Sequence, residues 1–126
     1  MTVATGATIL AIEDEPLNAS LLRAILSPAG YDLHIEPSLA DARDWLEGSS
    51  PALVLLDRHL PDGDGLELVP ELRASPLTQH CRILVLSASV LPDDRAAAEL
   101  AGVDGFMAKP LRIAALLEEI RRQLAS

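Results

Sequence analysis

Aromatic residues, cysteine and lysine are nearly absent from this chain of 126 residues. It contains one tryptophan, one tyrosine and one phenylalanine, so a packed core has to be aliphatic, and the stacking platform that binds single-stranded nucleic acids is missing. Its one cysteine, Cys81, excludes an internal disulfide framework and a cysteine-rich zinc site. Apolar runs are far shorter than a membrane span, and residues 1–6 lack the pattern of a signal peptide.

Positive charge is scarce as well. Ten basic residues stand against nineteen acidic ones, which gives a formal net charge of −9 and an isoelectric point near 4.6. A phosphate backbone needs a positive surface, so we expect no direct nucleic-acid partner. Apolar residues make up 49% of the chain, enough for one core in a domain of this length. We therefore expect a single cytoplasmic domain over 1–126, with 1–6 as a flexible N-terminal extension and no membrane contact.

Short apolar runs alternate with segments of helical periodicity. Buried strands are typical of such runs, and they are expected at 8–12, 53–56 and 83–86. A shorter, more exposed strand is expected at 32–36, where polar and apolar residues alternate, and a short fifth strand at 105–108. Helices are expected between and after them, at 16–27, 38–48, 66–74, 92–102 and 111–124. Pro70 removes a backbone donor, which predicts a kink or a later start for the third helix. Alternation of this kind predicts an open, doubly wound α/β fold with a five-stranded parallel sheet and five helices.

Polar side chains with chemical potential follow four of these strands. Glu13 and Asp14 follow the first strand, Asp57 the third, Ser87 the fourth and Lys109 the fifth. The carboxyl ends of parallel strands meet at one edge of the sheet, where ligands bind. Clustered carboxylates repel one another unless a cation lies between them, and Mg²⁺ prefers oxygen ligands. The pattern thus predicts a magnesium site. The alternative, that the first two acids only favour a helix N-terminus, does not explain the third.

Asp57 ends a run of four apolar residues, so its carboxylate is either an unfavourable burial or a nucleophile. Carboxylates can accept a phosphoryl group and form an aspartyl phosphate. Metal-assisted transfer needs donors for the phosphoryl oxygens, and Ser87 and Lys109 supply a neutral and a charged one. Lys109 is the one lysine among the ten basic residues. Chance placement on a solvated loop is the alternative for this lysine.

Four sequence blocks, in this order and at these strand ends, resemble the receiver domain of response regulators in two-component signalling, which has a flavodoxin-like fold. The blocks are residues 12–18, then 55–57 with 60–61 and 64–65, then 87–88, and finally 109–110. The resemblance covers nearly the whole chain. It implies that Asp57 is the phospho-acceptor, and that the donor is a histidine kinase or a histidine phosphotransfer protein of a phosphorelay.

The resemblance also implies a set of metal ligands. Asp14 and Asp57 would hold Mg²⁺ directly, together with the backbone carbonyl of His59. Glu13 would act through a water molecule. The residue at 59 also matches a variable position that influences the lifetime of the phosphoryl group in this family.

A switch is implied by further matches. Ser87 would hydrogen-bond the phosphoryl group and Lys109 would pair with it, while Phe106 matches the aromatic switch position that turns inward. Phe106 lacks a phenol hydroxyl, so this switch would depend on packing alone. The Lys109–Pro110 peptide bond is expected to be cis. The surface of the fourth helix, fifth strand and fifth helix would then change shape and bind a downstream effector protein.

Two other functions are considered beside this signalling switch, which is not a conventional enzyme and at most phosphorylates and dephosphorylates itself. An aspartate-nucleophile phosphohydrolase would need a second aspartate two residues after the nucleophile, where His59 stands. A docking domain that ignores phosphorylation would be expected to lack an acceptor or metal carboxylate, and none is missing. Met1 favours a stand-alone regulator, a relay intermediate or an N-terminal fragment, and homodimer formation stays open.

Overall fold

A parallel sheet of five strands forms the centre of the computed structural model, which describes residues 6–125. The expected extension at 1–6 therefore lies, apart from Gly6, outside the described residues. The order β2-β1-β3-β6-β7 places at the edges the two strands that were predicted to be short. The strands are β1 (Thr8–Ile12), β2 (Asp32–Glu36), β3 (Leu53–Asp57), β6 (Arg82–Ser87) and β7 (Gly105–Ala108).

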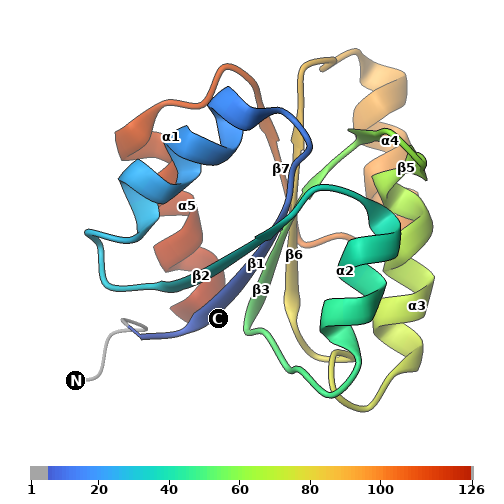
Figure 1. Ribbon diagram of the computed structural model, residues 1–126. Helices are drawn as coiled ribbons and strands as arrows, with labels where there is room; N and C mark the ends of the chain where they lie inside the picture. Colours follow the sequence, from blue (N-terminus) through green and yellow to red (C-terminus); the bar gives the residue numbers. More distant parts are fainter. Residues whose placement is uncertain (1–5, 126) are drawn as a thin grey trace.

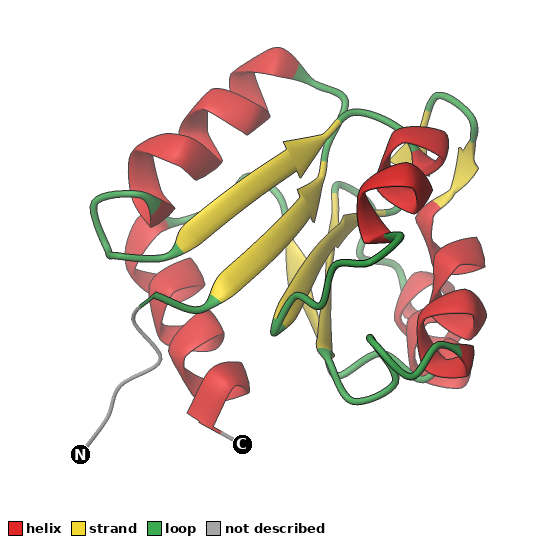
Figure 2. Ribbon diagram, turned by 60° about the horizontal axis from the view of Figure 1, so that its bottom comes forward, coloured by secondary structure: helices red, strands yellow, loops and turns green. Residues whose placement is uncertain are grey.

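Helices cover both faces of the sheet, as Figure 1 and Figure 2 show. One face carries α1 (Pro16–Leu26) and α5 (Ile113–Ala125), and the other carries α2 (Leu39–Leu46), α3 (Leu68–Ala74) and α4 (Pro92–Ala101). This arrangement confirms the predicted doubly wound α/β fold. No helix within residues 6–125 is both long enough and apolar enough to span a bilayer.

Side-chain alternation along the central strands divides the core in two. On β1, Leu10 and Ile12 pack under α2, α3 and α4, whereas Ile9 and Ala11 pack under α1 and α5. Successive strand residues point to opposite faces, so a strand covered on both sides has to be apolar throughout. All five residues of β3 are buried, the terminal Asp57 among them. The fold thus brings a carboxylate to the end of the most enclosed strand.

The third helix shows how Pro70 is accommodated. Residues Gly65–Glu67 form a short 3-10 turn, and the α-helix begins only at Leu68. Pro70 is then the third helical residue, where backbone N–H groups have no partner within the helix in any case. The later start that the sequence predicted is confirmed, and the missing donor breaks no helical hydrogen bond.

A hairpin that the sequence did not predict follows β3 directly. Its strands β4 (His59–Leu60) and β5 (Gly63–Asp64) pair antiparallel. Asp62 at its tip accepts hydrogen bonds from the backbone N–H groups of Leu39 and Ala40 at the start of α2, at 2.9 and 3.0 Å. These bonds lower the pKa of Asp62. The hairpin is therefore tied to a neighbouring helix N-terminus, which favours negative charge.

Candidate functional site

Three carboxylates meet at the carboxyl edge of the sheet. Glu13 and Asp14 directly follow β1, and Asp57 ends β3, which lies between β1 and β6. One carboxylate oxygen from each residue lies within 4.8 Å of those of the other two. Glu13 and Asp57 are only 3% and 7% exposed, whereas Asp14 is exposed. Hard oxygen donors at this spacing suit a divalent cation such as Mg²⁺.

Lys109, directly after the edge strand β7, links the two buried carboxylates. Its Nζ lies 2.8 Å from Oε1 of Glu13 and 3.2 Å from Oδ2 of Asp57. Burial alone would lower the pKa of Lys109, but the hydrogen bond to Glu13 and the charge of Asp57 outweigh burial and raise that pKa. The ammonium group therefore stays charged and partly neutralises the cluster. Sequence reasoning placed Lys109 at this edge but did not identify its link to Glu13.

The hairpin β4–β5 and the residue after it, Gly65, pack closely against Asp57. The backbone N–H of His59 donates to Oδ1 of Asp57 at 3.2 Å, and the N–H of Gly65 donates to the carbonyl of Arg58 at 2.8 Å. A Cβ atom at Gly65 would lie 2.1 Å from the carbonyl oxygen of Asp57. Only glycine allows this approach, because real Cβ atoms do not come so close to a backbone oxygen.

Ser87 and Phe106 lie on the strands that follow Asp57 in the sheet. Ser87 ends β6 and is fully buried; its hydroxyl donates to the carbonyl of Ser89 at 2.9 Å and accepts from the N–H of Ser89 at 3.2 Å. Phe106 on β7 is half-buried, and the guanidinium carbon of Arg95 lies 4.9 Å from its ring centroid. The Lys109–Pro110 peptide bond, which follows β7, is cis. In this conformation both hydrogen bonds of the Ser87 hydroxyl are thus made with the backbone of Ser89, in the loop that follows β6.

Arg58 is a site residue that the sequence did not single out. It follows Asp57, and its guanidinium pairs with Asp64 on the hairpin and with Asp94 in the first turn of α4. The distances are 3.1 Å to Oδ1 of Asp64 and 3.3 Å to Oδ1 of Asp94. Because Arg58 and Asp94 are 36 residues apart, no local pattern could have indicated this contact.

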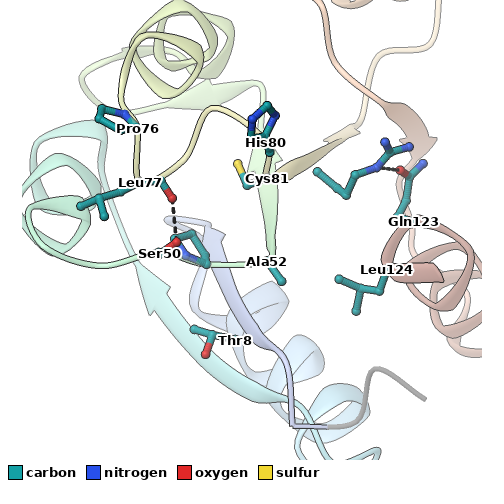
Figure 3. Close-up of a pocket in the computed structure, with 11 residues that line it drawn as sticks. Thr8, Ser50, Ala52, Pro76, Leu77, His80, Cys81, Gln123 and Leu124 are labelled. Carbon is teal, nitrogen blue, oxygen red and sulfur yellow. Dashed lines mark hydrogen bonds between the residues drawn. The ribbon is translucent and has the colours of Figure 1, made fainter. Parts of the chain in front are cut away.

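A hollow of about 530 Å³ lies at the opposite, amino-terminal edge of the sheet, and Figure 3 shows its lining. Ser50 donates there to the carbonyl of Leu77 at 2.7 Å, and Gln123 accepts from Arg82 at 3.0 Å. Cys81 in this lining is buried, and burial raises the pKa of its thiol. Ser50 and Gln123 are engaged in these hydrogen bonds, and the hollow lies at the edge of the sheet opposite to the carboxylates, so it does not extend the site.

Similarity to known proteins covers nearly the whole chain. The family model of the response regulator receiver domain matches residues 9–121. The polar-differentiation response regulator DivK of Brucella ovis is 26% identical over 117 residues, which are 93% of this chain and 95% of DivK. Among solved structures, a putative response regulator from Chloroflexus aurantiacus is 29% identical with a TM-score of 0.89, over 95% of this chain and 98% of that one.

A second solved structure bears on the acidic cluster. The receiver domain of a sensor histidine kinase from Pseudomonas aeruginosa is 30% identical with a TM-score of 0.88, over 96% of this chain and 99% of that one, and it holds a magnesium ion in its active-site cleft. The family match, the five-stranded fold and the carboxylates at the sheet edge agree. The chain belongs to the response regulator receiver domain family of two-component signalling.

Proposed function

We propose that this chain is a phospho-acceptor switch over its full length, 1–126, with Asp57 as the acceptor. The observation that carries the proposal is that Lys109 forms ion pairs with both buried carboxylates, Asp57 and Glu13, beside the exposed Asp14. One oxygen of Asp57 accepts from the Lys109 ammonium group and the other from the His59 N–H. Such contacts fix the orientation of the Asp57 carboxylate at the carboxyl edge of the sheet, and a phosphoryl donor would approach it there.

The proposed reaction is a displacement at phosphorus. An oxygen of Asp57 attacks the phosphorus of a phosphohistidine on a histidine kinase or phosphotransfer protein. A P–O bond forms and the P–N bond breaks; its electron pair stays on the imidazole nitrogen of the donor, which then takes up a proton. The Lys109 ammonium group is within reach of the new phosphoryl oxygens and offsets their charge.

Mg²⁺ fits the donor set of this site. The three clustered carboxylates provide only oxygen ligands, as a hard divalent cation requires. Asp14, Asp57 and the His59 carbonyl would hold the ion directly, and Glu13 through water. When bound, it would supply positive charge that stabilises the phosphoryl oxygens during transfer.

The proposed output is a change at the surface formed by α4, β7 and α5. The Ser87 hydroxyl would leave the carbonyl of Ser89 and donate to the phosphoryl group. Phe106, which contacts Arg95 in the present conformation, would turn inward as Ser87 moves. Because this ring carries no hydroxyl, its two positions would differ in packing and in the cation–π contact. A downstream effector protein would bind the altered surface.

Solution NMR of the Mg²⁺-loaded chain, recorded before and after addition of beryllofluoride, tests this function directly. We expect amide shifts at Asp57, Ser87 and Lys109 that spread to Phe106 and α5. The matched control is Asp57→Asn, which keeps the size of the side chain and should abolish the shifts. An unchanged wild-type spectrum from a folded chain would refute the switch and support a docking domain instead. Steady release of inorganic phosphate from added phosphomonoesters would support a phosphohydrolase.

A further inference from the structure

Arg58 connects the acceptor strand to the loop that carries the partner of Ser87. Its side chain is 16% exposed, and its guanidinium pairs with Oδ1 of Asp94, whose side chain is 24% exposed. An ion pair that is largely shielded from solvent is screened less than a surface pair, so it contributes more to the geometry of the groups it joins. The contact spans from the residue after Asp57 to the first turn of α4.

The second oxygen of Asp94 holds the loop 88–91. Oδ2 accepts a hydrogen bond from the hydroxyl of Ser89, and another from the backbone N–H of Leu91 at 3.1 Å. The carbonyl of Ser89 in turn accepts from the hydroxyl of Ser87 at 2.9 Å. One carboxylate therefore fixes the loop that keeps the Ser87 hydroxyl turned toward Ser89.

We propose that Arg58 is a positioning residue that holds the loop 88–91, through Asp94, in the conformation in which the Ser87 hydroxyl is turned to Ser89. This inference rests on the proposed function. Before the Ser87 hydroxyl can donate to a phosphoryl group, it has to give up the Ser89 carbonyl, and the loop has to change. The ion pair of Arg58 with Asp94 opposes that change, so it restrains the phosphorylated conformation.

Removal of the Arg58 guanidinium has two effects of opposite sign on the affinity for beryllofluoride. Arg58→Met deletes a positive charge near the acceptor, which lowers affinity for an anion. It also frees the loop, which raises affinity because less of the binding free energy is spent on rearranging it. Asp94→Asn frees the loop while removing a negative charge. If the loop restraint governs the outcome, both variants bind more tightly, although their charge changes are opposite.

The test measures the affinity of the Mg²⁺-loaded chain for beryllofluoride in the wild type, Arg58→Met, Asp94→Asn and the double variant. We expect a gain of about threefold to tenfold in each single variant, and no further gain in the double variant, because coupled residues are not additive. Arg43→Met is the control: it removes the same charge and breaks a more exposed ion pair, with Glu71 between α2 and α3, and it should leave the affinity unchanged. Unchanged or weaker binding in Arg58→Met, even with tighter binding in Asp94→Asn, would show that charge alone governs the affinity and would overturn the inference, as would additive gains.

Amide hydrogen exchange on the metal-free chain provides a readout that does not depend on phosphorylation. We expect the N–H of Leu91 to exchange faster in Arg58→Met and in Asp94→Asn than in the wild type and in Arg43→Met. Equal exchange in all four chains would show that Arg58 does not hold the loop. Failure of the wild type to bind beryllofluoride would refute the proposed function instead, and the exchange experiment would still decide whether Arg58 positions the loop.

Discussion

Replacement of Lys109 by methionine tests the electrostatics of the acceptor site. Methionine keeps an unbranched, apolar stem but lacks the ammonium group that lies 2.8 Å from Glu13 and 3.2 Å from Asp57. The lysine side chain is 13% exposed, and the two carboxylate side chains are 2% and 9% exposed. The substitution therefore leaves two carboxylates facing each other with little solvent to separate them.

The expected loss of stability follows from this burial. Removing one partner of a buried ion pair lowers the free energy of unfolding by about 3–5 kcal/mol. Because the exposed Asp14 opens one side of this cluster to water, we expect the lower end, about 3 kcal/mol, in metal-free buffer at pH 7. The pKa of Lys109 is raised in the folded chain. The contribution of Lys109 to the free energy of unfolding is thus complete below the pKa of lysine in the unfolded chain, about 10.4, and is lost only as pH rises through the folded pKa.

Urea denaturation followed by circular dichroism measures this loss. With an m-value of about 2 kcal/mol/M, a loss of 3 kcal/mol lowers the urea midpoint by roughly 1.5 M. Millimolar Mg²⁺ should restore much of the stability of Lys109→Met and raise that of the wild type less, because the ion replaces the lost positive charge. Lys109→Arg retains the charge and serves as the control. If Lys109→Met is as stable as the wild type without Mg²⁺, Lys109 is not the counter-ion that the geometry indicates.

Three further outcomes can be measured with the same denaturation assay. Gly65→Ala should destabilise the chain by at least about 3 kcal/mol, because its Cβ would overlap the carbonyl oxygen of Asp57, and unaltered stability would contradict the close fit. Leu84→Ala, at a position with no exposed surface, should lower the free energy of unfolding by about 2–5 kcal/mol. The hydrogen bond to Arg43 lowers the pKa of Glu71, so the small stabilisation from this pair is complete above the unfolded pKa and disappears as pH falls through the folded pKa. Glu71→Gln should therefore differ from the wild type by less than about 1 kcal/mol at pH 7, and the difference should shrink as pH falls through the folded pKa of Glu71.

The fold could be predicted from the sequence because buried parallel strands leave a strong signal. The run 53–56 is apolar on both faces, and β3 is buried on both faces. Edge strand β2 alternates polar and apolar residues and was correctly expected to be more exposed. The hairpin β4–β5 escaped prediction because each of its strands has only two residues, too few for any periodicity. Its position depends instead on the hydrogen bonds that the Asp62 carboxylate accepts from the start of α2.

At the site, the sequence indicated which residues gather but not how they pair. Strand ends placed Glu13, Asp57 and Lys109 at one edge, and the structure brings them into contact. The choice of Glu13 as a partner of Lys109 depends on side-chain directions that residue spacing does not encode. The contact of Arg58 with Asp94 depends on where α4 begins relative to β3. Contacts between distant segments of this kind require the three-dimensional fold.

The charges at the acceptor edge explain why two basic residues lie so close to it. Glu13, Asp14 and Asp57 carry three negative charges and Lys109 carries one positive charge, which leaves −2, the amount that one divalent cation balances. Phosphorylation would add negative charge again, and this addition favours any positive group that can turn toward it. Lys109 already faces that position, whereas Arg58 is held away by Asp64 and Asp94. Under the proposed function, the same kind of attraction would prepare Lys109 for the phosphoryl group, and the ion pairs of Arg58 would commit Arg58 to restraining the loop 88–91.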